Sequence, residues 1–304
     1  MHDVAQQLVN GLSLGAIYAL IALGYTMVYG IIELINFAHG DVYTLGTFFS
    51  LAILGLLGVS GQVHGPAMLV DVAIAVVGAM LLCGLTGVLI ERLAYRRLRN
   101  APRLAPLITA IGVSFILENI MQWWRGPSPV PFPQVIPNPG WTLGGIEIQA
   151  KQIMVIIFAI VMMVALQLFI HNTKLGKAMR ATAQDRDAAQ LMGININMTI
   201  ALTFLIGSAL AGAAGFVSGV YYQSTWFFNG FNAGLKAFTA AVLGGIGNLA
   251  GAMLGGFCIG IFEALANLFP NGNQWSNVVV FSVLVLVLIF RPSGLLGESL
   301  PEKV

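Results

Sequence analysis

The sequence alternates between long apolar segments and short polar connections from one end to the other. A helix needs roughly 20 apolar residues to cross about 30 Å of hydrocarbon, and segments of this kind recur throughout the chain. The pattern therefore predicts membrane-spanning helices near residues 8–31, 41–60, 67–90, 104–124, 152–170, 199–222, 248–269 and 276–290.

A shorter apolar segment at residues 237–247 breaks this regularity. Its roughly 11 residues rise only about 16 Å as a helix, which is too short to cross alone. Two interpretations stay open: a half-helix that dips into the membrane, or a span lengthened by flanking residues. The glycine-rich run at 243–248 predicts a turn before the next span, because it is too flexible for a helix interior.

Composition assigns the whole chain to one membrane domain. Its 304 residues are 58% hydrophobic and only 9% charged, with a mean hydropathy of +0.86, whereas soluble domains carry about 25% charged residues. We therefore expect residues 1–304 to form an all-α polytopic membrane protein with about eight transmembrane helices and a possible half-helix. The net charge of +2 gives no indication of nucleic-acid binding.

Basic residues indicate the orientation, because cytoplasmic connections carry an excess of Lys and Arg. Eleven of the 14 lysines and arginines lie in the connections 91–103 and 171–198 or in the C-terminal tail. Arg125, Lys151 and Lys236 fall on the opposite side in this scheme. We expect the N-terminus outside and the C-terminus in the cytoplasm, which requires 237–247 and 248–269 to cross as a down-and-up pair.

The connection at 171–198 is the longest polar interruption that is rich in charge. Asp185 is a typical N-cap and Gly193 a typical C-terminal stop for a short helix. The half before Asp185 predicts a helix with two faces. Leu175, Ala178, Met179 and Thr182 share one face at helical spacing, and Lys177, Arg180 and Gln184 fall on the other. Two short helices outside the membrane offer a surface for a soluble partner; the alternative is a solvated connection.

Polar side chains at membrane depth are costly and point to a transport path or a broken helix. The first cluster lies in GIIELINFAHGD and comprises Glu33, Asn36, His39 and Asp41. We interpret it as an irregular segment packed within protein, and the alternative is a plain interfacial turn. His39 could pair with Glu33 or with Asp41. The further candidates for a path are Glu118, Asn119, Glu263 and Asn267, for which helix–helix hydrogen bonding is the simpler role.

The outer connection at 125–151 contains six of the twelve prolines, between Pro127 and Pro139. Proline at this density predicts an extended, semi-rigid segment that is neither helix nor central strand. The segment is either a stiff strap between spans or a docking surface for an outside partner.

The chain lacks the sequence G-x-x-x-x-G-K-[ST] of a phosphate-binding loop, H-E-x-x-H and any Cys–His metal spacing. We therefore expect no catalysis by this chain and no cofactor bound to it. If ATP drives transport, a separate subunit must hydrolyse it.

Residues 11–46, GLSLGAIYALIALGYTMVYGIIELINFAHGDVYTLG, closely resemble the LivH-type permease subunits of high-affinity branched-chain amino acid ABC importers. LMGIN at 191–195 and FTAAVLGGIGNLAGAMLGG at 238–256 resemble the same family. Asp187-Ala188-Ala189 followed by Gly193 resembles the EAA motif of ABC-importer permeases, with Asp in place of the usual Glu. The resemblance implies an ATPase-coupling surface made by Lys177, Arg180, Asp185, Asp187, Ala188, Ala189 and Gly193.

The resemblance also implies a working assembly in the lipid of the bacterial inner membrane. A second related permease would complete the path, two ATPase subunits would bind ATP and Mg, and a periplasmic binding protein would deliver leucine, isoleucine or valine. Three alternatives stay open: a urea or short-amide importer subunit, an ion-coupled secondary transporter, and a channel or structural subunit.

Overall fold

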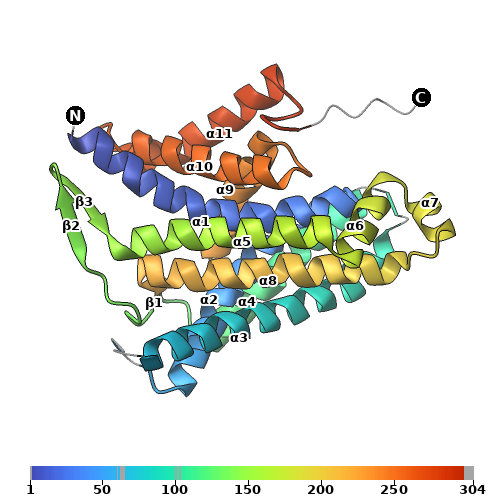
Figure 1. Ribbon diagram of the computed structural model, residues 1–304, viewed down its shortest axis with the longest axis horizontal. Coiled ribbons are helices and arrows are strands. Elements are labelled where there is room, and N and C mark those ends of the chain that lie inside the picture. Colours follow the sequence, from blue (N-terminus) through green and yellow to red (C-terminus); the bar gives the residue numbers. More distant parts are fainter. Residues whose placement is uncertain (1, 60, 62–65, 100, 103, 298–304) are drawn as a thin grey trace.

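The computed structural model describes residues 2–59, 61, 66–99, 101–102 and 104–297. Long helices lie side by side in one bundle (Figure 1), as the apolar segments predict. The α-helices are α1 (His2–Ile32), α2 (His39–Leu56), α3 (Pro66–Ile90), α4 (Leu104–Arg125), α5 (Ala150–Asn172), α6 (Lys174–Gln184), α7 (Arg186–Leu191), α8 (Ile196–Tyr222), α9 (Asn229–Gly244), α10 (Leu249–Ala266) and α11 (Gly272–Phe290).

Among the described residues, six helices are long and apolar enough to cross a membrane. They are Asp3–Ile32, Ala67–Leu98, Leu104–Arg125, Ala150–Asn172, Ile196–Tyr222 and Leu249–Ala266. The predicted segments 41–60 and 276–290 correspond to α2 and α11, and the predicted end at residue 60 lies outside the described residues. α2 is the more polar of these two helices, because His39 and Asp41 occupy its first turn.

The short apolar segment 237–247 belongs mostly to α9, which begins at Asn229 and so includes flanking residues. α9 and α10 run antiparallel, since an added Cβ at Gly255 would lie 2.0 Å from the Ala240 carbonyl, while Lys236 pairs with Glu263 farther from the turn. The prediction of a down-and-up pair is thus confirmed as an antiparallel helix pair. Lys236, which the basic-residue pattern places on the side opposite the charged connections, lies within α9 and contacts Glu263 of α10.

Glycines allow α1 and α10 to pack with their backbones in contact. An added Cβ at Gly15 would lie 2.7 Å from the Phe257 Cα, and one at Gly260 would lie 2.2 Å from the Gly15 nitrogen. Small residues at a four-residue spacing permit this approach. α1 is consequently buried along most of its length and forms the centre of the bundle.

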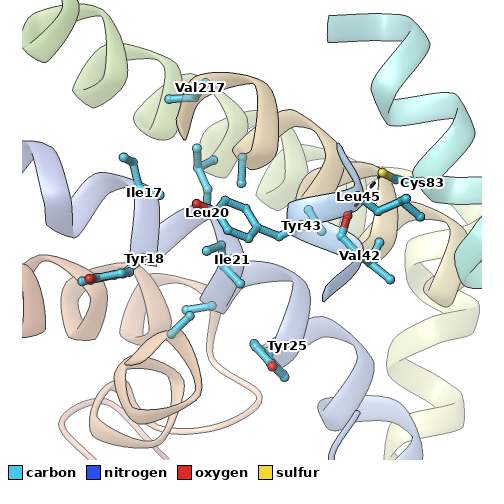
Figure 2. Close-up of a cluster of buried hydrophobic side chains, with 14 of the residues drawn as sticks. Ile17, Tyr18, Leu20, Ile21, Tyr25, Val42, Tyr43, Leu45, Cys83 and Val217 are labelled. Carbon is cyan, nitrogen blue, oxygen red and sulfur yellow. Dashed lines mark hydrogen bonds between the residues drawn. The ribbon is translucent and has the colours of Figure 1, made fainter. Parts of the chain in front are cut away.

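The core around α1 draws side chains from four helices (Figure 2). Ile17, Leu20 and Ile21 of α1 are at most 1% exposed. They lie in one cluster with Val42, Tyr43 and Leu45 of α2, Cys83 of α3 and Val217 of α8. The Cys83 thiol donates to the Val42 carbonyl at 3.4 Å, so this cysteine is a core residue, as expected.

The two ends of the bundle differ. One end carries the hairpin of β2 (Gly140–Leu143) and β3 (Ile146–Gln149) and is called the hairpin end; the other carries α6 and α7 and is called the α7 end (Figure 1). In the proline-rich part, β1 (Val130–Pro131) pairs with β4 (Ser224–Thr225) for two residues only. The hairpin was not predicted, although Gly144 and Gly145 at its turn have positive φ angles of 57° and 87°.

Candidate functional site

The loop at 171–198 folds as the two short helices that its sequence predicts. Thr173 begins α6, and its hydroxyl accepts from the Gly176 N–H at 3.0 Å. Met179 and Thr182 are buried, whereas Lys177 and Arg180 are exposed. Arg180 also donates to the Ile170 carbonyl at 2.7 Å, which satisfies one of the free carbonyls near the end of α5.

Both predicted ends of α7 are confirmed. The Asp185 carboxylate accepts from the backbone N–H groups of Asp187 and Ala188 at 2.9 and 3.0 Å, as an N-cap does. Gly193 follows the helix at φ 84°, a conformation that suits glycine, and the next N–H, of Ile194, donates to the Ala189 carbonyl.

The tip of α7 presents apolar side chains to the surroundings. Leu191 and Met192 are 88% and 83% exposed, whereas Ala189 on the inner side is 4% exposed. Asp187 and Ala188 are also exposed, so the predicted partner surface is accessible. Leu191 and Met192 were not among the predicted surface residues. Their position directly before a helix-ending glycine is the sequence signal that could have identified them.

Arg186 connects α7 to the end of α1. Its Nη2 donates to the Ile31 carbonyl at 3.1 Å, which satisfies a carbonyl that the helix leaves free. A cavity of about 510 Å³ lies beside this contact, and its lining includes Glu33, Arg99 and Asp185. Glu33 is exposed and has φ 56°, so it is part of the α7 end and not of the buried cluster that follows it.

A buried charge cluster joins the end of α3 to the start of α8. Glu91 is fully buried in the π-helical turn η1 (Glu91–Tyr95) and accepts from Arg99, with Arg96 Nε at 3.6 Å. Arg99 also donates to the Asn197 side chain at 2.6 Å. Burial lowers the pKa of the Arg99 guanidinium, and the Glu91 carboxylate opposes that shift. Arg99 was counted only among the basic residues that indicate orientation, and no role was predicted for Glu91.

The segment after α1 is irregular and packed within protein, as predicted. Asn36 is 3% exposed and accepts from the Tyr95 hydroxyl at 3.1 Å. His39 is 1% exposed, and its ring centroid lies 4.7 Å from that of Tyr25. The predicted pairing of His39 is not seen, since its Nε2 has no hydrogen-bond partner within the described residues.

Asp41 and Glu118 lie on facing helices, α2 and α4. Asp41 accepts from the Ser114 hydroxyl, while its Oδ1 and the Oε1 of Glu118 are buried without a hydrogen-bond partner in the described part of the chain. Asn119 is exposed and donates to the Phe115 carbonyl at 2.7 Å within its own helix. Glu118 thus faces the bundle, and Asn119 does not.

Glu263 and Asn267 lie at the hairpin end, where they line a cavity of about 780 Å³. Glu263 Oε1 is 2.5 Å from Lys236 Nζ, and Glu263 Oε2 accepts from the Tyr18 hydroxyl at 2.9 Å. Lys236 was not a predicted site residue, because nothing in the sequence indicated its contact with Glu263. Seven of the eight candidate path residues therefore occupy three places: the α7 end, the buried region around Asp41, and the hairpin-end cavity. Asn119 is exposed on α4 and lies in none of them.

Amide side chains attach the hairpin to the bundle beside this cavity. Gln6 of α1 donates to the Glu147 carbonyl at 2.9 Å and accepts from the Glu147 N–H at 2.8 Å. Gln152 of α5 donates to the Asn10 side chain at 2.9 Å. These bonds hold β3 against the first turns of α1.

Known proteins match the chain over its full length. Residues 7–288 match the family described as "Branched-chain amino acid transport system / permease component". The high-affinity branched-chain amino acid transport system permease protein BraD of Pseudomonas aeruginosa is 45% identical and is aligned over 100% of this chain and 99% of its own. The corresponding protein LivH of Escherichia coli K12 is 45% identical, over 98% and 97%. A probable LivH permease of Methanocaldococcus jannaschii is 29% identical, over 91% and 88%.

Proposed function

The chain belongs to the family of branched-chain amino acid transport permease components, and we propose on this basis that it is the membrane subunit of an ATP-driven importer for leucine, isoleucine and valine. The observation that carries the proposal is 45% identity over nearly the whole chain to two high-affinity permeases of that name. The aligned region covers all helices of the bundle, including α6 and α7.

The proposed assembly contains a second related permease, two ATPase subunits and a periplasmic binding protein. One ATPase subunit docks on α6 and α7, where Lys177, Asp187 and Ala188 are exposed around the apolar tip of Leu191 and Met192. ATP and Mg are bound by the ATPase subunits, and this chain binds no cofactor. ATP binding and hydrolysis shift the permease between two packings that are close in free energy.

The proposed orientation places the hairpin end in the periplasm and the α7 end in the cytoplasm of a bacterial inner membrane. This puts Lys177, Arg180 and Arg186 on the cytoplasmic side, as the excess of basic residues there requires. α1 begins at the hairpin end. Leu295 and Leu296, which follow α11, donate to carbonyls at the α9–α10 turn, and this turn lies beside Gly30 near the other end of α1. This arrangement gives an outer N-terminus and a cytoplasmic C-terminus. In this topology, α9 and α10 form a down-and-up pair between α8 and α11, so that the number of crossings is odd and the two ends of the chain lie on opposite sides.

Uptake assays test the function directly. The chain is expressed with its partner permease, ATPase subunits and binding protein in cells without other branched-chain amino acid uptake, and radiolabelled leucine and urea are compared. We expect leucine accumulation that stops when ATP is depleted while the ion gradient is maintained. Urea uptake without leucine uptake would reject the substrate, and gradient-driven accumulation by the chain alone would reject the mechanism.

A further inference from the structure

Lys236 of α9 and Glu263 of α10 form an ion pair inside the helical bundle. Their charged atoms are 2.5 Å apart, and the two side chains are only 11% and 12% exposed. Charged side chains within membrane helices are costly, so they occur mainly where they pair or line a path. Replacing a buried ion pair by apolar residues is often neutral or stabilising. A contribution to stability alone is therefore a weak explanation for the presence of this ion pair.

The Glu263 carboxylate is held by a hydrogen bond and lies beside a cavity. The Tyr18 hydroxyl donates to Glu263 Oε2 at 2.9 Å, and Lys236 Nζ lies 5.9 Å from the centre of the Tyr18 ring. Glu263 also lines the hairpin-end cavity, together with Asn267 of the same helix. The cavity volume of about 780 Å³ is in the usual range for small-molecule sites. A solute in the cavity can therefore reach Glu263, the member of the pair that lines it.

A free amino acid carries the same two charges as this pair, an ammonium group and a carboxylate one carbon apart. Its ammonium group can donate to Glu263 from the cavity. Its carboxylate can accept from Lys236, which lies directly behind Glu263 and does not itself line the cavity, so that each protein charge exchanges one partner of opposite sign for another. No charge is left unpaired by this exchange, which limits its cost. Leu14 and Ala264 in the cavity lining supply apolar surface for an aliphatic side chain.

We propose that Lys236 and Glu263 are a recognition site for the ammonium and carboxylate groups of a free amino acid that enters through the hairpin-end cavity. Tyr18 is a positioning residue, since it holds the Glu263 carboxylate toward both Lys236 and the cavity. This inference rests on the proposed function, and it gives the permease its own selectivity for zwitterions in addition to that of a binding protein.

The test uses the complete importer in proteoliposomes with loaded binding protein, measuring leucine uptake and ATP hydrolysis together. The variants are a charge swap, Lys236→Glu with Glu263→Lys, and an uncharged pair, Lys236→Met with Glu263→Gln. Asp3→Asn is the control, because it removes an exposed carboxylate at the same end of α1. Recognition predicts assembled complexes that hydrolyse ATP but take up leucine roughly tenfold more slowly or worse, with the control unchanged.

The outcomes separate recognition from a structural role. A structural ion pair tolerates the swap, so wild-type uptake by the charge-swapped complex would overturn the inference. If the charge-swapped chain does not assemble, the uncharged pair decides: wild-type uptake overturns the inference, and lost uptake in an assembled, ATP-hydrolysing complex supports it. Absence of leucine uptake by the unmutated complex would instead reject the proposed function.

Discussion

Single side chains at helix ends determine the shape of the charged loop. Asp185 caps the start of α7, Gly193 follows its end, and Arg186 donates to the Ile31 carbonyl of α1. An isolated helix of six residues is unstable in water, because nucleation costs more than so few hydrogen bonds return. The position of α7 therefore depends on these end residues more than on its own sequence.

Gly193→Arg tests this dependence. Arg at φ 84° is strained by about 1–3 kcal/mol, so we expect α7 to shift, and leucine uptake and ATPase co-purification to fall at normal membrane abundance. Gly193→Asn is the matched control, since Asn tolerates positive φ. Equal loss in the Asn variant would show that the position matters for a reason other than backbone conformation.

The apolar tip of α7 gives a second prediction. Leu191→Ser with Met192→Ser should leave folding nearly unchanged, because both side chains are more than 80% exposed. It should weaken ATPase association by about 2 kcal/mol if they are central contacts, measured by co-purification under increasing salt and detergent. Met198→Ser, at 60% exposure in the first turn of α8, is the control. Unchanged co-purification in the double variant would place the ATPase contact elsewhere.

The sequence predicts some residue roles and not others. Asp185 and Gly193 were predictable because a cap acts within three residues of its own position. Lys236 and Glu263 are 27 residues apart, and Tyr18 is 245 residues from Glu263, so only the packed bundle brings them together. Glu91 escaped notice for a different reason. Its partner Arg99 is only eight residues away, but a π-helical turn changes the usual helical spacing between them.

At the scale of elements, the packing of α1 on α10 has a testable cost. A Cβ at Gly260 would lie within 2.4 Å of backbone atoms of Gly15 and Gly11. Gly260→Leu should therefore separate the helices and destabilise the protein by about 1–3 kcal/mol or more, seen as a lower melting temperature in detergent.

Gly112→Ala is the control for this substitution. Gly112 has no other atom within 4 Å of an added Cβ. Alanine there should leave the melting temperature equal or raise it, because alanine favours helix by about 1 kcal/mol over glycine. If the Gly260→Leu variant has the same melting temperature as this control, the backbones of α1 and α10 are not in contact.

Helices were predicted correctly where the length of an apolar segment determines the structure. Elements that depend on contacts with distant parts of the chain were not predicted. The long apolar segments all form helices. The hairpin at 140–149 was missed, since its four-residue strands are held mainly by the turn at Gly144 and Gly145 and by Gln6. The first half of α9 stayed one of two open alternatives, because the glycine- and asparagine-containing stretch from Asn229 has a weak intrinsic preference for helix.

At the scale of the whole molecule, the proposed orientation predicts that only the hairpin end is accessible from outside the cell. Thr142→Cys on the exposed side of β2 should react with a membrane-impermeant maleimide in intact cells, whereas Lys177→Cys on α6 should react only after permeabilisation. Cys258→Ala removes the half-buried native thiol, and Cys83 is fully buried. The reverse labelling pattern would invert the proposed orientation.

The family and the multi-pass helical architecture were predictable from the sequence. The resemblance of residues 11–46 to branched-chain amino acid permeases is confirmed by matches over nearly the whole chain. The distribution of the path candidates over three separate places was not predictable. Asp41, Glu118 and Glu263 look equivalent in sequence, as single carboxylates in apolar segments, and only their neighbours in the bundle distinguish them.

α1 contacts both ends of the molecule within one unbroken helix. Gln6 binds the hairpin in its early turns, Tyr18 binds Glu263 farther along, and Ile31 accepts from Arg186 in the last turn. A helix of 31 residues is about 46 Å long. Because the helix is stiff along its axis, a displacement of α7 of 1–2 Å, the size of known helix shifts, that passes to Ile31 through the Arg186 hydrogen bond would move the Tyr18 hydroxyl by a similar amount. The Tyr18–Glu263 contact near the hairpin end is thus mechanically linked to the position of α7 at the other end of the bundle.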